Sequence, residues 1–113
     1  MLNFCKVTQA QFYREVEGKQ VALLDAGTTT RATFSNLLES IEPAKAAINS
    51  GKFVKRSSDF YRLLVDGSKS YGHTKGSTLY KACTDEGKVI FVIHEIRQGF
   101  AYDWFLVYRL EEA

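Results

Sequence analysis

The alternation of hydrophobic and polar residues is most regular in the last third of the chain, where it predicts β-strands. The runs are STLYKACT at 77–84, KVIFVIHEI at 88–96 and FAYDWFLVYRL at 100–110. Between the first two lies Asp85-Glu86-Gly87, which has the composition of a tight turn with glycine in the left-handed position. Strands that follow one another through short turns form an antiparallel meander.

The final run carries large side chains at alternate positions, which places them on one face of the predicted strand. They are Phe100, Tyr102, Trp104, Leu106, Tyr108 and Leu110. A solvent-exposed row of this size would favour aggregation, so we expect it to be core or an interface. An interface between two copies of the chain, in a homodimer, is one way to bury it.

Helical spacing dominates the first half of the chain. Thr8 and Gln11 form a capping-box pattern at the start of a helix, between short strands expected at 3–7 and 20–25. Apolar residues at helical intervals, followed by PAKAAINS, predict a helix or a kinked pair of helices over 35–50.

Two segments fit either type of element. Residues 28–34, TTTRATF, suit a strand that pairs with the preceding one, or the approach to the next helix. In residues 59–66, Phe60, Leu63 and Leu64 follow helical spacing. The flanks and surroundings of that segment are typical of strands, so we expect a strand there.

These elements predict an α+β fold, with N-terminal helices packed on one face of a mainly antiparallel β-sheet that ends in a three-stranded meander. A chain of 113 residues has the size of one domain, so we expect a single domain over 1–113. Its content of 45% hydrophobic and 25% charged residues is ordinary for a globular protein.

Targeting and redox features point to the cytoplasm. The first residues lack the apolar run of a signal peptide, and no apolar stretch is long enough to span a membrane. Cys5 and Cys83 are too few for a disulfide framework, so we expect buried, reduced thiols. Sequence spacing leaves a bridge between the two open.

Positive charge is concentrated in the middle of the chain. Residues 52–81 hold seven Lys or Arg and two Asp, a net charge of +5, whereas the remainder sums to −3 and the whole chain to +2. This asymmetry predicts a region that faces an anionic partner.

The segment GSKSYGHTKGS, Gly67 to Ser77, lies inside this basic region. Its glycines would let backbone amides approach a ligand, and its lysines would contact phosphate oxygens. Tyr71 and His73 would stack on bases. The alternative is a solubilising connector without a binding role.

Rings and cations also alternate around this segment, with Phe53, Phe60, Tyr61 and Tyr80 among the Lys and Arg residues. A basic face with accessible rings is what single-stranded nucleic acid requires of a protein. The alternative is that the rings point into the core while the charges face water. The partner-binding residues that we predict are Lys52, Lys55, Arg56, Arg62, Lys69, Tyr71, His73 and Lys75.

The sequence lacks signatures of catalysis and metal binding. GxSxG, HExxH, GxGxxG and Walker A patterns do not occur. The Cys and His residues lack the paired spacing of a zinc site, so we expect no metal and no cofactor. His94 is expected to be a hydrogen-bonded residue of the sheet. His73 is accessible for acid–base work, but no partner carboxylate or second histidine is identifiable.

We therefore expect a small non-enzymatic binding protein that docks its basic, aromatic face on a protein complex that handles nucleic acid. We expect an inhibitor or adaptor, of the kind that phages make against host defence. Direct binding of single-stranded nucleic acid or RNA is the first alternative. A small enzyme that uses His73 as acid or base is the second.

Overall fold

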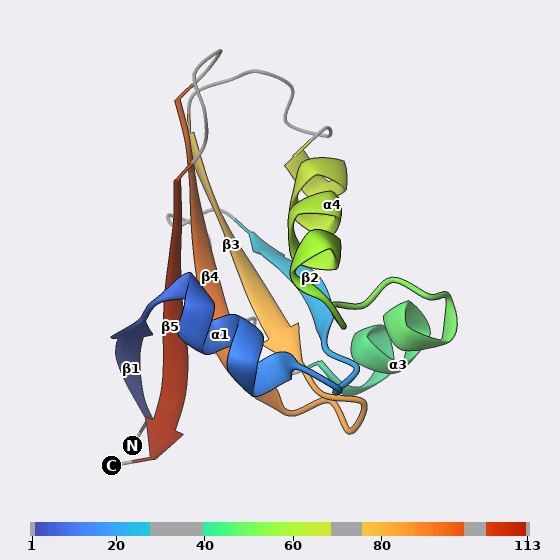
Figure 1. Ribbon diagram of the computed structural model, residues 1–113. Helices are drawn as coiled ribbons and strands as arrows, with labels where there is room; N and C mark the ends of the chain where they lie inside the picture. The colour runs from blue at the N-terminus through green and yellow to red at the C-terminus, as the bar shows by residue number, and fades with distance from the viewer. Residues whose placement is uncertain (1, 28–39, 69–75, 99–103, 113) are drawn as a thin grey trace.

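The computed structural model describes residues 2–27, 40–68, 76–98 and 104–112. Its elements in chain order are β1 (Leu2–Val7), α1 (Gln9–Val16), β2 (Ala22–Gly27), α3 (Ile41–Asn49), α4 (Ser57–Ser68), β3 (Gly76–Cys83), β4 (Val89–Arg97) and β5 (Trp104–Glu112) (Figure 1). The strands form one antiparallel sheet in the order β1-β5-β4-β3-β2. The predicted α+β fold and its terminal meander are confirmed, because β3, β4 and β5 are neighbours in the sheet.

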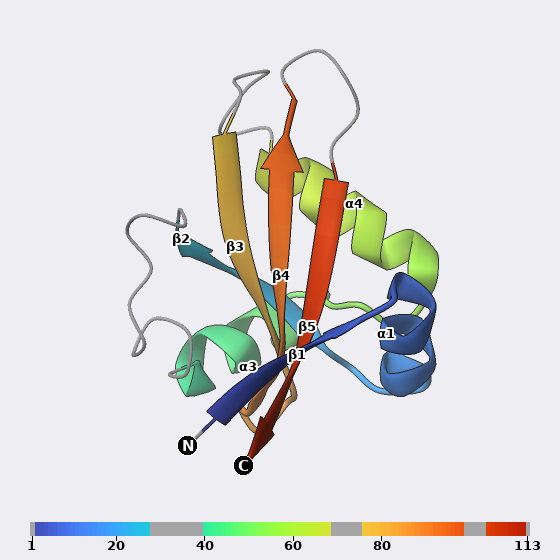
Figure 2. The same ribbon diagram turned by 90° about the vertical axis from the view of Figure 1, so that its left-hand side faces the viewer.

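Helices α1 and α4 cover one face of the sheet, which we call the inner face; in Figure 2, α4 lies behind the strands. Phe12 of α1 and Phe60 of α4 are fully buried there, with their ring centroids 5.1 Å apart. Phe91 of β4 meets the Phe12 ring edge-on at 4.9 Å. Ile93 and Val107 complete this core from alternate strand positions, as the pleat of a sheet requires.

Helix α3 packs on the opposite face, which we call the outer face, close to β2. Ala44 of α3 is fully buried in a second cluster with Ala22 of β2 and Cys83 of β3. In β5, Phe105 contacts the rings of α4 on the inner side. Trp104, the preceding residue, is 56% exposed, so the predicted row of large residues is not core at this position.

The capping box at the start of α1 is confirmed. The amide of Gln11 donates to Thr8 Oγ1 at 3.1 Å, and the amide of Thr8 donates to Gln11 Oε1 at 2.8 Å. These two bonds satisfy donors that the first helical turn leaves without a partner. The start of this helix is therefore fixed by local sequence.

The prediction of a strand over residues 59–66 is wrong, because this segment belongs to α4. Its sequence is compatible with the two-residue period of a strand and with the 3.6-residue period of a helix, and packing against the sheet selects the helix. In a helix Phe60 and Leu64 lie one turn apart, and both are completely buried against the inner face. The other ambiguous segment, 28–34, lies outside the described residues.

Gly87 gives the β3–β4 turn a left-handed residue, with φ +84, as the turn prediction requires. It also lies against the start of α3, since a Cβ at this position would come within 2.4 Å of Ile41 Cα. The turn is thus a contact between the meander and α3.

The two cysteines are not bridged. Cys83 is buried on the outer face, as expected, whereas Cys5 is only half-buried and donates to Glu111 Oε2 at 3.2 Å. Burial raises the pKa of the Cys83 thiol, and the bond to Glu111 raises that of Cys5. Raised pKa values leave little thiolate, the reactive form.

Within the described parts of the chain, no helix combines the length and apolar character needed to cross a membrane.

Candidate interaction surface

Half of the predicted partner-binding residues lie on one continuous stretch of the chain. Lys52, Lys55, Arg56 and Arg62 are all exposed, on the connection between α3 and α4 and on α4 itself. The other four, Lys69, Tyr71, His73 and Lys75, lie outside the described residues. The structure therefore gives positions for four of the eight predicted partner-binding residues.

Two of the four rings that we grouped with these cations are not accessible, and a third, Phe53, is half-buried. Phe60 and Tyr80 are 0% and 3% exposed, and both belong to the inner-face core. Lys81 is also buried, on the outer side of β3. The alternative in which rings point inward is thus observed for Phe60 and Tyr80, because the helical period turns Phe60 towards the sheet.

Tyr61 is the ring that stays in solvent beside the cations, and Val65 follows it one helical turn later. Their side chains are 45% and 56% exposed. We call Lys55, Arg56, Tyr61, Arg62 and Val65 the α4 surface. Sequence reasoning missed Val65, although its spacing of one helical turn from Tyr61 would have identified it had the segment been assigned as a helix.

Contacts on three sides hold the Tyr61 ring. Its hydroxyl donates to Gln9 Oε1 at 2.8 Å, and its centroid lies 6.4 Å from that of Tyr13 and 6.2 Å from that of Phe105. Burial, together with the neighbouring Tyr61, raises the pKa of Tyr13, so the Tyr13 hydroxyl stays neutral at physiological pH. A ring fixed before binding loses little conformational entropy when a partner docks.

A single carboxylate organises the cations at the start of α4. Asp59 Oδ2 accepts from the amides of Lys55 and Arg56 at 3.2 and 3.0 Å. Its Oδ1 lies 3.6 Å from Arg56 Nη2 and 3.7 Å from Arg62 Nη2, and the two arginine side chains remain 77% and 55% exposed. Burial opposes the charged form of Asp59, but these amides and the Arg56 guanidinium outweigh it and lower its pKa.

We predict that Asp59→Asn lowers the free energy of unfolding by about 1 kcal/mol at neutral pH, because it weakens the bonds at the helix start. The lowered pKa of Asp59 stabilises the fold above the ordinary carboxyl value of 3.8, and this gain is lost as the pH falls through the folded-state pKa. The gap between wild type and variant in urea unfolding should therefore narrow below about pH 4. A gap independent of pH would contradict this role.

The ends of the segment Gly67 to Ser77 lie against buried polar side chains of the inner face. A Cβ on Gly67 would come within 3.0 Å of the Tyr80 hydroxyl, and one on Gly76 within 2.9 Å of Arg97 Nη2. Arg97, itself buried, donates to Thr78 Oγ1 and lies 3.3 Å from Glu95 Oε1. Tyr80 and Arg97 therefore lie beside the two ends of the predicted binding segment, and sequence reasoning did not single out Arg97.

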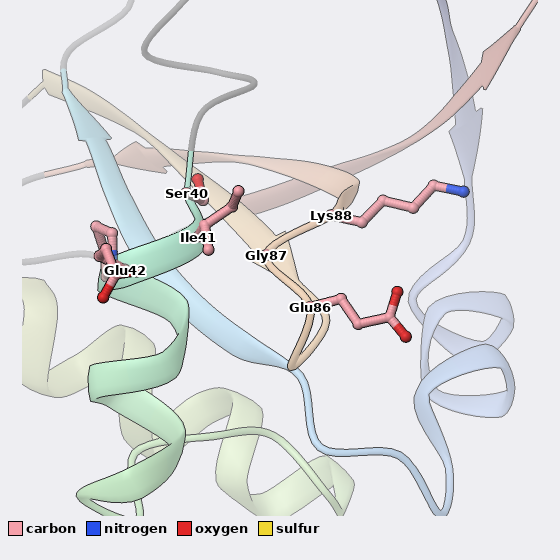
Figure 3. Close-up of a pocket in the computed structure, with 7 residues that line it drawn as sticks. Ser40, Ile41, Glu42, Glu86, Gly87 and Lys88 are labelled. Carbon is pink, nitrogen blue, oxygen red and sulfur yellow. The ribbon is translucent and has the colours of Figure 1, made fainter.

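A depression of about 710 Å³ lies between the start of α3 and the β3–β4 turn (Figure 3). Its charged side chains do not converge: Glu86 and Lys88 extend away from Ile41 and its neighbours on α3. A second depression, of about 450 Å³, lies beside Arg109, whose guanidinium is paired with Glu15 and Glu111. The first depression thus lacks the convergent polar groups that a small-molecule site needs, and in the second the Arg109 guanidinium is already bound by carboxylates.

His94 lies in β4, as expected, but its predicted hydrogen bond is not observed. Nε2 is buried and has no hydrogen-bond partner among the described residues. Burial lowers the pKa of His94, so the ring is neutral at pH 7. Across the described ranges, no group of three or more His, Cys, Asp or Glu side chains is arranged to hold a metal ion.

Comparison with protein-family models, with curated proteins and with solved structures finds no match to this chain.

Proposed function

We propose that this protein is a cytoplasmic inhibitor or adaptor that binds another protein through the α4 surface. The observation that carries the proposal is the exposed pair Tyr61 and Val65, one helical turn apart and flanked by cations. Tyr and Arg are the residue types most enriched among those that dominate binding energy at protein interfaces. A helix that presents an apolar ridge suits a groove on its partner.

The charge of this region specifies the chemistry of the partner. Residues 52–66 hold four Lys or Arg and two Asp, a net charge of +2. Lys55 and Arg56 directly precede α4, where the positive end of the helix dipole adds to their charge. We therefore infer an acidic groove on the partner, and we retain the sequence-based expectation that the partner belongs to a complex that handles nucleic acid.

The test is affinity capture from nuclease-treated lysate with wild type and two variants of the α4 surface, Val65→Glu and Arg56→Glu/Arg62→Glu. Ile41→Glu and Lys45→Glu are the matched controls, since Ile41 is 55% exposed on another helix, against 56% for Val65. We expect one protein to be retained by wild type and by both controls, and lost by both α4 variants. Equal retention by all five proteins would refute binding through α4.

A further inference from the structure

The outer face of the sheet carries accessible rings on the strands farthest from β2. Phe4 of β1 is 44% exposed and Trp104 of β5 is 56% exposed, while Tyr108 lies between them, half-buried. The strand register places all three on the outer face, because Phe4 pairs with Leu110 and Lys6 with Tyr108. Figure 2 shows this side of the sheet towards the viewer, with β3, β4 and β5 in front of α4.

The rings follow a line along β5. Tyr108 and Trp104 are four residues apart in one strand, which corresponds to about 13 Å. Phe4 is the diagonal neighbour of Tyr108, at about 7 Å. Leu106 lies between the two rings of β5 on the same face, so the side chain that joins them along the strand is apolar.

An exposed lysine lies beside the middle ring of this face. Lys6 is exposed, and its strand partner is Tyr108. Lys81 and His94 also occupy outer-facing strand positions, but Lys81 is buried. Glu112, at the end of β5, occupies an outer-facing position too, since it pairs with Leu2. Three accessible rings with an exposed lysine beside the middle one complement an anion that has flat apolar groups.

We propose that this outer face binds single-stranded nucleic acid by stacking bases on Trp104, Tyr108 and Phe4, with Lys6 contacting the phosphates. Antiparallel sheets that bind RNA stack about two or three bases on rings of an accessible face. Stacking on aromatic side chains tolerates any base, so binding would show little sequence preference. This surface lies on the opposite side of the sheet from α4 and does not depend on the proposed protein partner.

The chain contains a single tryptophan, so Trp104 itself reports on the site. The experiment is a titration of the full chain with oligothymidylate and oligouridylate of about ten nucleotides, followed by tryptophan fluorescence. We expect saturable quenching. Phe4→Leu should weaken binding about tenfold, because it keeps an apolar side chain but removes a ring that stacks. Lys6→Gln should make the dependence of log affinity on log salt shallower by about 0.7.

Matched controls come from the other side of the molecule. Tyr61→Leu removes a ring that is 45% exposed, against 44% for Phe4, and Arg62→Gln removes an exposed cation. Both should leave quenching unchanged, and circular dichroism should show that all four variants are folded. Absence of quenching, or equal losses in the controls, would overturn the proposal. A dimer in sedimentation whose Trp104 emission is already blue-shifted without oligonucleotide would also overturn it, in favour of a second copy on this face.

Discussion

Arg97→Leu should lower the free energy of unfolding by about 3–5 kcal/mol, the usual cost of breaking a buried ion pair by removing one partner. Arg97 is 8% exposed and Glu95 is 1% exposed, with 3.3 Å between Arg97 Nη1 and Glu95 Oε1. The guanidinium also donates to Thr78, which is completely buried. The substitution would leave the Glu95 carboxylate in the interior without this cation. A loss of this size is a large part of the stability of a small domain.

Urea unfolding of wild type and variants measures the effect. Arg109→Leu is the matched control, because it removes an arginine paired with Glu15 where both side chains remain partly exposed, at 30% and 38%. We expect that change to cost about 1 kcal/mol or less. The double variant Glu95→Leu/Arg97→Leu should recover most of the loss, since apolar replacements of a buried pair are often close to neutral. Equal costs for Arg97→Leu and Arg109→Leu would show that burial of the pair contributes nothing.

Gly87→Ala should cost about 3 kcal/mol of unfolding free energy, for two reasons that add. The residue has φ +84, where a side chain is strained by about 1 kcal/mol or more. The new Cβ would also lie 2.4 Å from Ile41 Cα, so the β3–β4 turn and the start of α3 must separate. Forcing an extra carbon into a packed contact costs a further 1–3 kcal/mol, roughly.

Gly18→Ala separates the two contributions. Gly18 has φ +76, but a Cβ there would meet nothing within 4 Å. We expect a loss of about 1 kcal/mol, from backbone strain alone. Urea unfolding of both variants gives the difference, which measures the contact with Ile41. Equal losses of unfolding free energy in the two variants would mean that the β3–β4 turn and α3 separate without a cost in free energy.

The candidate site was predictable only in part. Lys52, Lys55, Arg56 and Arg62 are exposed where the sequence places a basic region, because long charged side chains rarely lose their hydration. Which ring accompanies them was not predictable, since Phe60 and Tyr61 are adjacent and the choice depends on the direction of the helix face. The exposure of Val65 likewise depends on the direction of the helix face, because Val65 lies one helical turn after Tyr61.

The outer face shows a similar division. Alternation along β5 determines that Trp104, Leu106 and Tyr108 share one side, and the register confirms it. Alternation does not say which side the helices cover. That depends on where Phe12 and Phe60 find apolar partners, and they find them on the side of Phe91 and Val107.

The sequence by itself determined the meander and the start of α1. Period-two alternation and the pair Thr8 and Gln11 act between residues that are close in the chain, so no distant contact is needed to specify them. The tertiary structure decided that residues 59–66 are helical, that Lys81 is buried and that Trp104 faces solvent. In each of these the local sequence allows more than one arrangement, and burial of apolar surface against residues far along the chain selects among them.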